Sequence, residues 1–306
     1  MKVWILFNEE IESASAEAYE VRRLISEGRD MGIDVSVYRP EQIDLIVTED
    51  RRDSILIDGA LVPLPDFVLP RAYLLYAGYF YLAVIRQLER LGVTAFNPST
   101  TIEPVEDKLH AHQILAENGV ATPATMLAKF PIDIDLVEST LGFPVVAKTL
   151  NGGNGTGVFL LKNRDSFIEF ANLVRETNPN IALVFQEFIA ESQGTDLRLF
   201  VVDGEVVASM QRTASEGEFK ANYTQGGKVE EFVPDEAARN MALETARIFD
   251  IRLGGIDLLF SKESGYTVCE ANTFPGFKGI ESCCDVNIPR KIFEAMQRRL
   301  AEKEAA

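Results

Sequence analysis

Two alternating residues in the C-terminal third of the chain could bind a metal ion. Glu270 and Asn272 lie two positions apart in an apolar segment, so in a strand both project from one face and present oxygen atoms. Asp257 can join them, because the polar turn 261–265 allows its own apolar segment to pair antiparallel with theirs. Three oxygen ligands suit Mg²⁺, or Mn²⁺ in its place, which fills its other positions with water and phosphate oxygens. We therefore expect a metal site that binds a nucleotide.

A glycine-rich segment after Lys148 is a candidate for binding the phosphates. Gly153, Gly155 and Gly157 alternate with other residues directly after an apolar run. Such a loop lets backbone N–H groups approach phosphate oxygens. The segment has neither the order of a Walker A loop nor that of a dinucleotide fingerprint, and a plain flexible hairpin is the alternative interpretation.

Further candidates lie between the loop and the carboxylates. Another apolar run ends in Gln186, Glu187, Phe188 and Ile189. The backbone atoms of this segment could bind the edge of an adenine ring. The alternative interpretation is a solvated connector. Arg198 and Arg212 flank a predicted hairpin, and Lys220 and Asn222 follow in a polar loop. Each basic side chain alone could be a surface charge, but phosphoryl transfer needs positive charge around the transferred group.

The elements that must position these residues form a mixed α/β (α+β) pattern. Short apolar runs alternate with amphipathic stretches at the start, which is typical of βαβ units and a parallel sheet. We expect a first α/β lobe over residues 1–97, a central lobe over 98–188 and an antiparallel lobe over 189–306 that carries the metal site. The predicted helices span residues 14–31, 79–91, 105–118, 165–176, 235–249 and 288–303. The predicted strands include 3–7, 35–38, 124–127, 145–148, 158–161 and a hairpin turning at 203–204.

Composition excludes several classes of protein. The 306 residues are 46% hydrophobic, which supplies ample core, and carry a formal charge of −17 without a basic run, which argues against nucleic-acid binding. The apolar run at residues 3–7 is too short for a signal peptide, and no segment reaches the length of a membrane span, so we expect a soluble cytoplasmic protein. Cys269, Cys283 and Cys284 form no disulfide framework, and we expect them reduced.

The order of these features resembles that of the ATP-grasp superfamily of carboxylate–amine ligases, and more narrowly the RimK-type α-L-glutamate ligases. The matching segments are 69–71, 97–99, 106–108, 145–148, 186–189, 194–198, 217–222, 255–257 and 270–277. The resemblance implies an ATP-grasp fold, in which two lobes clasp ATP behind an N-terminal α/β lobe. It also implies a ligase that often forms dimers or tetramers.

Residue roles follow from the same resemblance. Lys108 and Lys148 would hold ATP phosphates under the glycine flap, Lys220 and Asn222 would lie near phosphate or metal, and Arg212 would stabilise an acyl-phosphate. The remaining implied roles are adenine binding by Gln186 to Ile189, ribose contact by Asp196, Mg²⁺ binding by Asp257, Glu270 and Asn272, and substrate contact by Arg71, Arg198 and Asn272. His110 and His112, the only histidines, receive no catalytic role.

The expected reaction joins L-glutamate to the carboxylate of a peptide, protein C-terminus or small metabolite. Family members usually carry Arg-Ser-Asn where this chain has Lys220, Ala221 and Asn222, so the acceptor stays open. One alternative is a ligase that uses another amino acid or makes dipeptides. A second alternative is a catalytically silent ATP-binding regulator. Replacing Asp257 or Glu270 by Ala is expected to abolish ATP turnover and to leave the fold intact.

Overall fold

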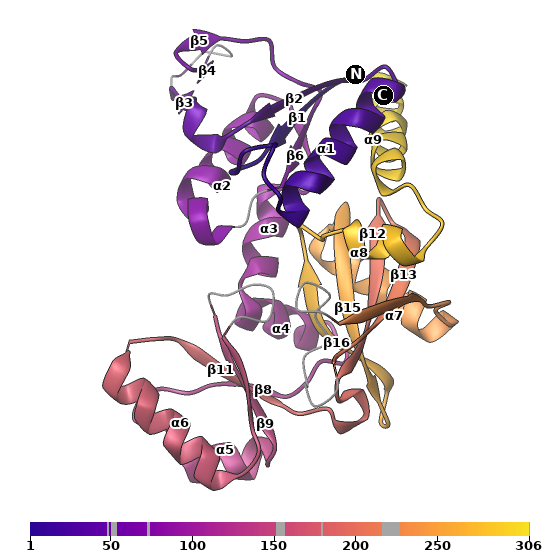
Figure 1. The fold of residues 1–306 in the computed structure, drawn as a ribbon. Coiled ribbons are helices and arrows are strands. Elements are labelled where there is room, and N and C mark those ends of the chain that lie inside the picture. The colour runs from indigo at the N-terminus through magenta and orange to yellow at the C-terminus, as the bar shows by residue number, and fades with distance from the viewer. Residues whose placement is uncertain are drawn as a thin grey trace.

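The structure is a computed structural model that describes residues 1–47, 49, 54–71, 74–150, 157–178, 180–215 and 227–305. Within these residues the chain forms a parallel sheet, two larger antiparallel sheets and a small antiparallel hairpin sheet. Figure 1 shows the parallel sheet at one end of the molecule and the sheet that contains β8, β9 and β11 at the other. The largest sheet lies beside the helices α3 and α4 that connect these two ends. The mixed α/β class predicted from the sequence is confirmed.

The parallel sheet forms because its central strand is apolar on both faces. It has the order β2 (Asp34–Tyr38), β1 (Lys2–Leu6), β6 (Phe67–Pro70) and β7 (Thr94–Ala95). Residues 3–6 are all buried, as expected for a strand covered on both sides. Helix α2 (Leu74–Arg90) packs on one face, where Trp4 and Leu6 point, and α1 (Ala16–Asp30) packs on the other.

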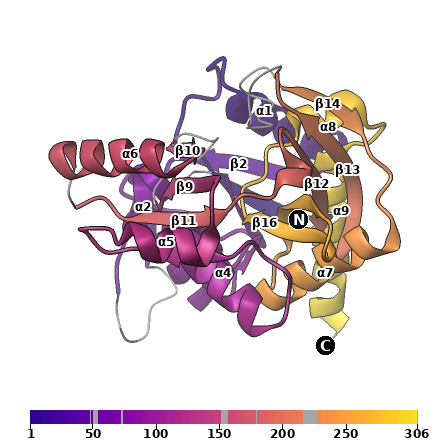
Figure 2. The ribbon, with the colours of Figure 1, turned by 90° about the horizontal axis from the view of Figure 1, so that it is seen from below.

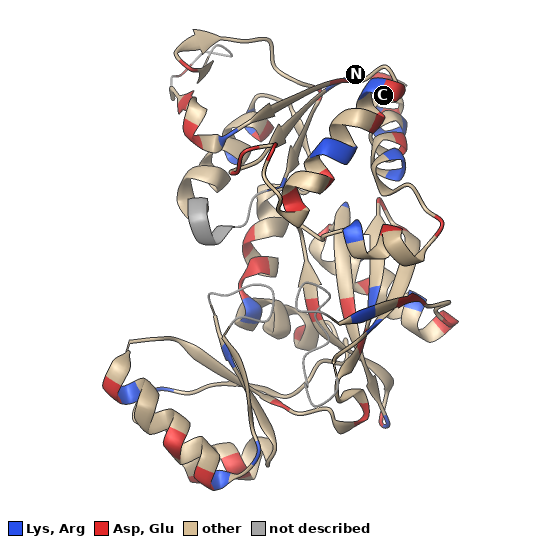
Figure 3. Cartoon of the chain, in the orientation of Figure 1, with Lys and Arg blue, Asp and Glu red and all other residues tan. Residues whose placement is uncertain are grey.

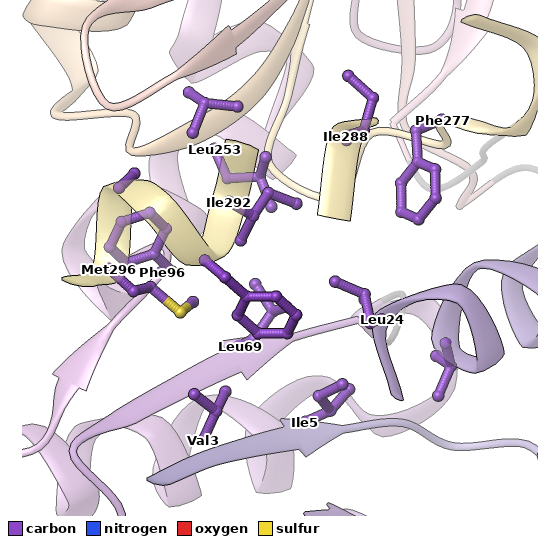
Figure 4. Close-up of a cluster of buried hydrophobic side chains, with 14 of the residues drawn as sticks. Val3, Ile5, Leu24, Leu69, Phe96, Leu253, Phe277, Ile288, Ile292 and Met296 are labelled. Carbon is purple, nitrogen blue, oxygen red and sulfur yellow. The ribbon is translucent and has the colours of Figure 1, made fainter. Parts of the chain in front are cut away.

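The C-terminal helix α9 (Ile288–Ala305) returns to this N-terminal sheet. Its Ile292 and Met296 lie in one buried cluster with Val3 and Leu69 of the strands, and Leu253 joins them from the largest sheet (Figure 4). The first core is therefore built from both ends of the chain.

A small hairpin sheet extends the N-terminal lobe. It contains β3 (Ile43–Leu45), β4 (Ile55–Ile57) and β5 (Ala60–Leu61), and the short 3₁₀ helix Pro40–Gln42 precedes it. Asp58 and Gly59 have φ of 50° and 78°, which fits the tight turn predicted from their sequence.

Helices α3 (Ser99–Glu106) and α4 (Lys108–Glu117) replace the single helix that we predicted over residues 105–118. The prediction was wrong because Asp107 has extended backbone angles and caps α4, accepting from the backbone N–H groups of Leu109 and His110. The break places Lys108 at the first position of α4.

The central sheet has the order β10 (Val158–Leu161), β9 (Val145–Thr149), β11 (Leu183–Glu187) and β8 (Thr125–Leu127), with antiparallel pairing. Helices α5 (Ile134–Leu141) and α6 (Arg164–Thr177) pack against it, as Figure 2 shows from below. Helix α5 was not predicted. The strand pair β9 and β10 confirms that the glycine-rich segment joins two neighbouring strands.

The largest sheet has the order β14 (Lys228–Glu231), β13 (Glu205–Thr213), β12 (Thr195–Val202), β15 (Leu253–Ser261) and β16 (Gly265–Asn272). Asp203 and Gly204, at φ of 50° and 80°, form the predicted turn between β12 and β13. Helices α7 (Glu236–Phe249) and α8 (Lys278–Cys283) and the 3₁₀ helix Ala190–Ser192 complete this lobe.

Asn97 joins the N-terminal lobe to the largest sheet. Its fully buried amide donates to the carbonyls of Leu253 and Thr273 and accepts from the backbone N–H groups of Arg252 and Leu253. All of its polar atoms are thereby used at the junction. Among the described residues, no helix combines the length and the apolar run needed to cross a bilayer.

Candidate active site

The predicted metal ligands lie side by side on neighbouring strands. In the antiparallel β15–β16 pair Glu270 lies opposite Asp257 and Asn272 lies opposite Gly255, and on the other side of β15 Arg198 of β12 lies opposite Asp257. Opposite residues of an antiparallel pair project from the same face. Figure 3 shows acidic and basic segments next to each other on these strands.

Two arginines hold Asp257. Arg198 makes a two-pronged contact, with Nε 2.7 Å from Oδ1 and Nη2 2.7 Å from Oδ2. The Nη2 of Arg212 lies 2.8 Å from the same Oδ2, and Arg212 also contacts both oxygens of Asp196, which lies opposite it on β12. The four side chains form one partly buried ion network.

Ion pairing favours the charged forms of Asp257 and Arg212, whereas burial outweighs ion pairing at Asp196 and raises its pKa. Burial alone would raise the pKa of Asp257, but Arg198 and Arg212 outweigh burial and hold the pKa below its usual range. Burial likewise acts to lower the pKa of Arg212, and Asp257 and Asp196 raise it instead. Asp257 is therefore ionised at neutral pH, which a metal ligand requires.

The donor set fits Mg²⁺ bound together with a polyphosphate. Asp257 and Glu270 could supply carboxylate oxygens and Asn272, whose Nδ2 lies 3.5 Å from Asp257 Oδ2, an amide oxygen, which would leave positions for phosphate oxygens and water. The described residues contain no cluster of three or more His, Cys, Asp or Glu that could hold a metal by itself.

A cleft beside the network lies between the central and largest lobes. Its polar lining comes from α4, β9, β11 and β16: Lys108, His112, Lys148, Gln186, Cys269 and Glu270. Val105, Leu115 and Val184 supply apolar surface. The Nζ of Lys108 lies 3.5 Å from the carbonyl of Leu150, at the start of the glycine loop, and the Nζ of Lys148 lies 3.9 Å from Cys269 Sγ. The structure therefore brings both predicted phosphate lysines and one predicted metal ligand to one cleft.

The glycine loop begins and ends in a fixed hairpin. Thr149 donates its backbone N–H to the carbonyl of Gly157, which has φ of +77°. A Cβ at Gly157 would lie 2.3 Å from Thr149 Oγ1. Both this close contact and the positive φ disfavour any residue other than glycine at this position. Gly153 and Gly155 lie outside the described residues, as do Lys220 and Asn222.

The predicted adenine segment is partly buried. Gln186 is buried and lines the cleft, Phe188 and Ile189 are half-buried, and Glu187 is exposed with its carboxylate 3.3 Å from the backbone N–H of Ala124. Gln186 thus brings a side chain, and not only backbone atoms, to the cleft.

Arg71 lies in a buried pair. Its guanidinium contacts the carboxylate of Glu20 and donates to the carbonyl of Pro275 at 3.0 Å. Glu20 also accepts from the backbone N–H groups of Phe277 and Lys278. These contacts tie β6 and α1 to the segment after β16, and the predicted contact of Arg71 with substrate stays a prediction.

Sequence reasoning missed Glu106 and His112. Burial raises the pKa of Glu106, which accepts from Thr273 Oγ1 at 2.7 Å and lies close enough to Lys108 and Glu270 to feel their charges. His112 lies four positions after Lys108, hence on the same face of α4, and that spacing was the available signal. Thr122, which contacts His112, carried no signal in the sequence.

Comparison with known proteins agrees with this geometry. Residues 1–102 match the RimK PreATP-grasp domain, and residues 105–296 match the RimK-like ATP-grasp domain. A "Probable alpha-L-glutamate ligase" of Legionella pneumophila (strain Corby) is 35% identical over 302 residues, which are 98% of this chain and 96% of that protein. A protein with the same name from Thioalkalivibrio sulfidiphilus (strain HL-EbGR7) is 36% identical over 301 residues, covering 97% of this chain and 96% of its own length.

Solved structures share the fold. The ATP-grasp ligase PsnB, complexed with minimal precursor, Mg and ADP, aligns with a TM-score of 0.73 at 18% identity and covers 97% of each chain. D-alanine–D-alanine ligase from Bacillus anthracis aligns with a TM-score of 0.70 at 18% identity and covers 99% of each chain. The fold and the site thus define an ATP-grasp ligase. The chain belongs to the RimK-like ATP-grasp family.

Proposed function

We propose that this ligase uses Mg-ATP to join the amino group of L-glutamate to a carboxylate of a peptide, protein C-terminus or small metabolite. The observation that carries the proposal is the cleft shared by Lys108, Lys148 and Glu270, next to the network of Asp257, Arg198 and Arg212. The names of the relatives from L. pneumophila and T. sulfidiphilus support glutamate as the amine.

Each group of residues binds a different part of Mg-ATP. Lys108 and Lys148 hold the phosphates, and Gln186 with residues 187–189 lines the adenine. The glycine loop, with Gly153, Gly155 and Gly157, closes over the phosphates, while Lys220 and Asn222 add polar groups near them. Asp257, Glu270 and Asn272 would hold Mg²⁺, which would offset charge on the phosphate oxygens. Asp196 orients Arg212 and lies near the ribose.

The reaction has two steps. An oxygen of the acceptor carboxylate attacks the γ-phosphorus, the bond to the β–γ bridging oxygen breaks, and ADP leaves. The amine nitrogen then attacks the acyl carbon, phosphate leaves, and the nitrogen loses a proton as the amide forms. Arg212 stabilises the negative charge that builds on the oxygens, a contribution that is typically worth about 10²–10³ in rate. Arg198 and Arg71 contact the incoming substrates.

The three lobes divide this task. Residues 1–97 form the N-terminal lobe, 98–188 the lobe that carries the loop, and 189–306 the lobe that carries the metal ligands, with α9 returning to the first.

We also propose that the protein forms a homo-oligomer. A ligase that acts on a different amino acid is the second candidate, because a structural neighbour is a D-alanine–D-alanine ligase.

The test mixes the protein with Mg-ATP, L-glutamate and a panel of acceptors that includes ribosomal proteins, short peptides and small carboxylates. Phosphate release and product mass are followed together. A glutamate-sized mass gain on one acceptor, coupled to phosphate release, supports the proposal. Release that requires a different amino acid supports the second candidate. Binding of Mg-ATP without release under any condition would overturn both and favour a regulatory protein.

A further inference from the structure

A chain of hydrogen bonds runs from the outer edge of β16, where the backbone N–H of Val268 donates to the carbonyl of Ala121, through α4 to the end of β11. The carbonyl of Val268 accepts from Thr122 Oγ1 at 3.1 Å, and Thr122 Oγ1 contacts Nδ1 of His112. On the other side of the ring, Nε2 of His112 lies 2.7 Å from Nε2 of Gln186. Nε2 of Gln186 also lies 2.9 Å from Thr125 Oγ1, the residue opposite it on β8.

The buried carbonyl at the sheet edge decides the direction of these bonds. Val268 is fully buried on the outermost strand, so its carbonyl needs a donor, and Thr122 supplies the hydroxyl proton. Since that hydroxyl has one proton, its oxygen must accept from His112, and Nδ1 of His112 must carry hydrogen. Burial, with a smaller effect of Lys148, lowers the pKa of His112 to about 4, so the ring is neutral and its Nε2 is an acceptor.

The neutral ring in turn orients the amide of Gln186. Its nitrogen donates one hydrogen to Nε2 of His112. The other hydrogen goes to Thr125 Oγ1, whose own proton is donated to the carbonyl of Pro123 at 2.8 Å. Both amide hydrogens are thereby used away from any ligand, and Oε1 is the polar atom that Gln186 retains for one.

Gln186 and His112 both line the cleft that contains Lys108 and Lys148. A carbonyl oxygen in a nucleobase site accepts from an exocyclic amino group and repels a keto oxygen. Adenine carries an amino group at C6, whereas hypoxanthine and guanine carry a keto oxygen there. A site built to bond one of these groups discriminates strongly against the other, because the mismatched polar groups stay unpaired.

We propose that His112 is a positioning residue that, held in its Nδ1–H tautomer by Thr122, fixes the amide of Gln186 and thereby makes the base site select a 6-amino purine over a 6-keto purine. The inference deepens the proposed nucleotide site and rests on it. It assigns a role to His112 and Thr122, which do not contact the base themselves but position Gln186, which does.

Thr122→Val and Thr122→Ser form a matched pair for the test. Valine keeps the shape of Thr122 and removes the hydroxyl, so His112 can take the Nε2–H tautomer and the Gln186 amide can flip. Serine keeps the hydroxyl and removes the methyl group. His112→Leu removes the acceptor for Gln186 altogether. Equilibrium binding of ATP and ITP, whose bases differ in the group at C6 and in the hydrogen that hypoxanthine carries on N1, is measured with Mg²⁺ for each protein, followed by kcat and KM for both nucleotides.

We expect the wild type and Thr122→Ser to bind ATP at least 10-fold more tightly than ITP. In Thr122→Val and His112→Leu we expect the ratio of the ATP affinity to the ITP affinity to fall by a factor of 10 or more. The change should appear in the KM values for the two nucleotides, with kcat at saturating nucleotide unchanged. A general loss of stability would weaken both nucleotides equally and leave the ratio unchanged. An unchanged ratio in both variants, with ATP still bound, overturns the inference and leaves the proposed function standing. If the wild type binds no Mg-ATP, the proposed function falls, and the inference falls with it.

A second measurement needs no nucleotide. The chain has two histidines, so nitrogen-15 labelling of histidine gives two sets of ring signals, and the His112→Leu variant assigns them. At neutral pH we expect a protonated Nδ1 and an unprotonated Nε2 for His112 in the wild type and in Thr122→Ser. The opposite tautomer or a charged ring in the wild type would overturn the inference.

Discussion

Glu270 and Asp257 face each other across the β15–β16 pair, yet the two carboxylates have different surroundings. Asp257 is 4% exposed and its oxygens are bonded by Arg198 and Arg212, whereas Glu270 is half-buried and lines the cleft. Removing one carboxylate therefore disturbs an ion network, and removing the other changes the cleft. Substitutions at Glu270 and Asp257 are therefore expected to differ in their effect on stability, although both should impair turnover.

Glu270→Gln should impair catalysis and preserve the fold. The amide removes a negative ligand from the proposed metal site, so we expect ATP turnover to fall by about 10²–10³, with a higher Mg²⁺ concentration needed for half-maximal activity. The measurement is phosphate release against Mg²⁺ concentration, together with Tm. Glu263→Gln, in the exposed turn between the same strands, is the control and should match the wild type. Normal turnover in Glu270→Gln would refute the metal assignment.

Asp257→Asn should lose stability as well as turnover. The substitution leaves Arg198 without the charge that it binds and leaves Arg212 with Asp196 alone, and breaking a buried pair costs about 3 kcal/mol or more. This changes the expectation from sequence that an Asp257 variant keeps an intact fold. Urea unfolding measures the loss. Asp203→Asn, which breaks a more exposed pair with Arg299, should change stability by less than about 1 kcal/mol. Equal stabilities for both variants would contradict the network.

Arg71→Met should destabilise the protein through Glu20. The variant leaves the Glu20 carboxylate buried without its partner, at a cost of about 3–5 kcal/mol. The double variant Glu20→Gln/Arg71→Met removes both charges and keeps an acceptor for the N–H groups of Phe277 and Lys278, so most of the loss should be recovered. Urea unfolding of the three proteins tests this. A raised KM for the acceptor at recovered stability would identify the predicted substrate contact of Arg71.

Stability should fall as the pH falls below neutral, because His112 is buried in its neutral form. Its pKa is about 4 in the folded protein and about 6.5 when unfolded, so the unfolded state binds more protons in this window. The stabilisation is present above pH 6.5 and is lost toward pH 4. Between pH 7.5 and 5.5 the loss from this residue should be about 1 kcal/mol. Urea unfolding at both pH values measures it, and His112→Leu should lack this share of the decrease. An equal decrease in both proteins would contradict the burial of a neutral ring.

Local pattern was sufficient to predict the metal hairpin and the base of the glycine loop. Asp257, Glu270 and Asn272 lie on two strands joined by a three-residue turn, so the short local sequence fixes the register of the two strands. The turn at Asp203 and Gly204 was equally local. Strand β14 was missed because it is a polar edge strand without apolar alternation, and the α3–α4 break was missed because the amphipathic pattern continues through Asp107.

Contacts between distant segments could not be predicted in this way. Arg198 meets Asp257 because β12 pairs with β15, whose paired residues lie 51 to 61 positions further along the chain, and sheet order is not encoded by any one segment. His112, Thr122 and Gln186 come from a helix, a loop and a strand, and their hydrogen bonds appear only after the lobes pack. The same holds for the pair of Arg71, predicted from the sequence only as a substrate contact, and Glu20, for which no role was predicted.

The return of α9 to the first sheet has a consequence for synthesis in the cell. Ile292 and Met296 complete the core around Val3 and Leu69, yet α9 leaves the ribosome nearly 200 residues after the N-terminal lobe. Helix α1 covers part of this face of the sheet from the start, and at about 5–20 residues per second the part that α9 covers stays exposed for roughly 10–40 s. The nascent chain therefore exposes apolar surface to general chaperones until α9 has been synthesised and can pack on the N-terminal sheet.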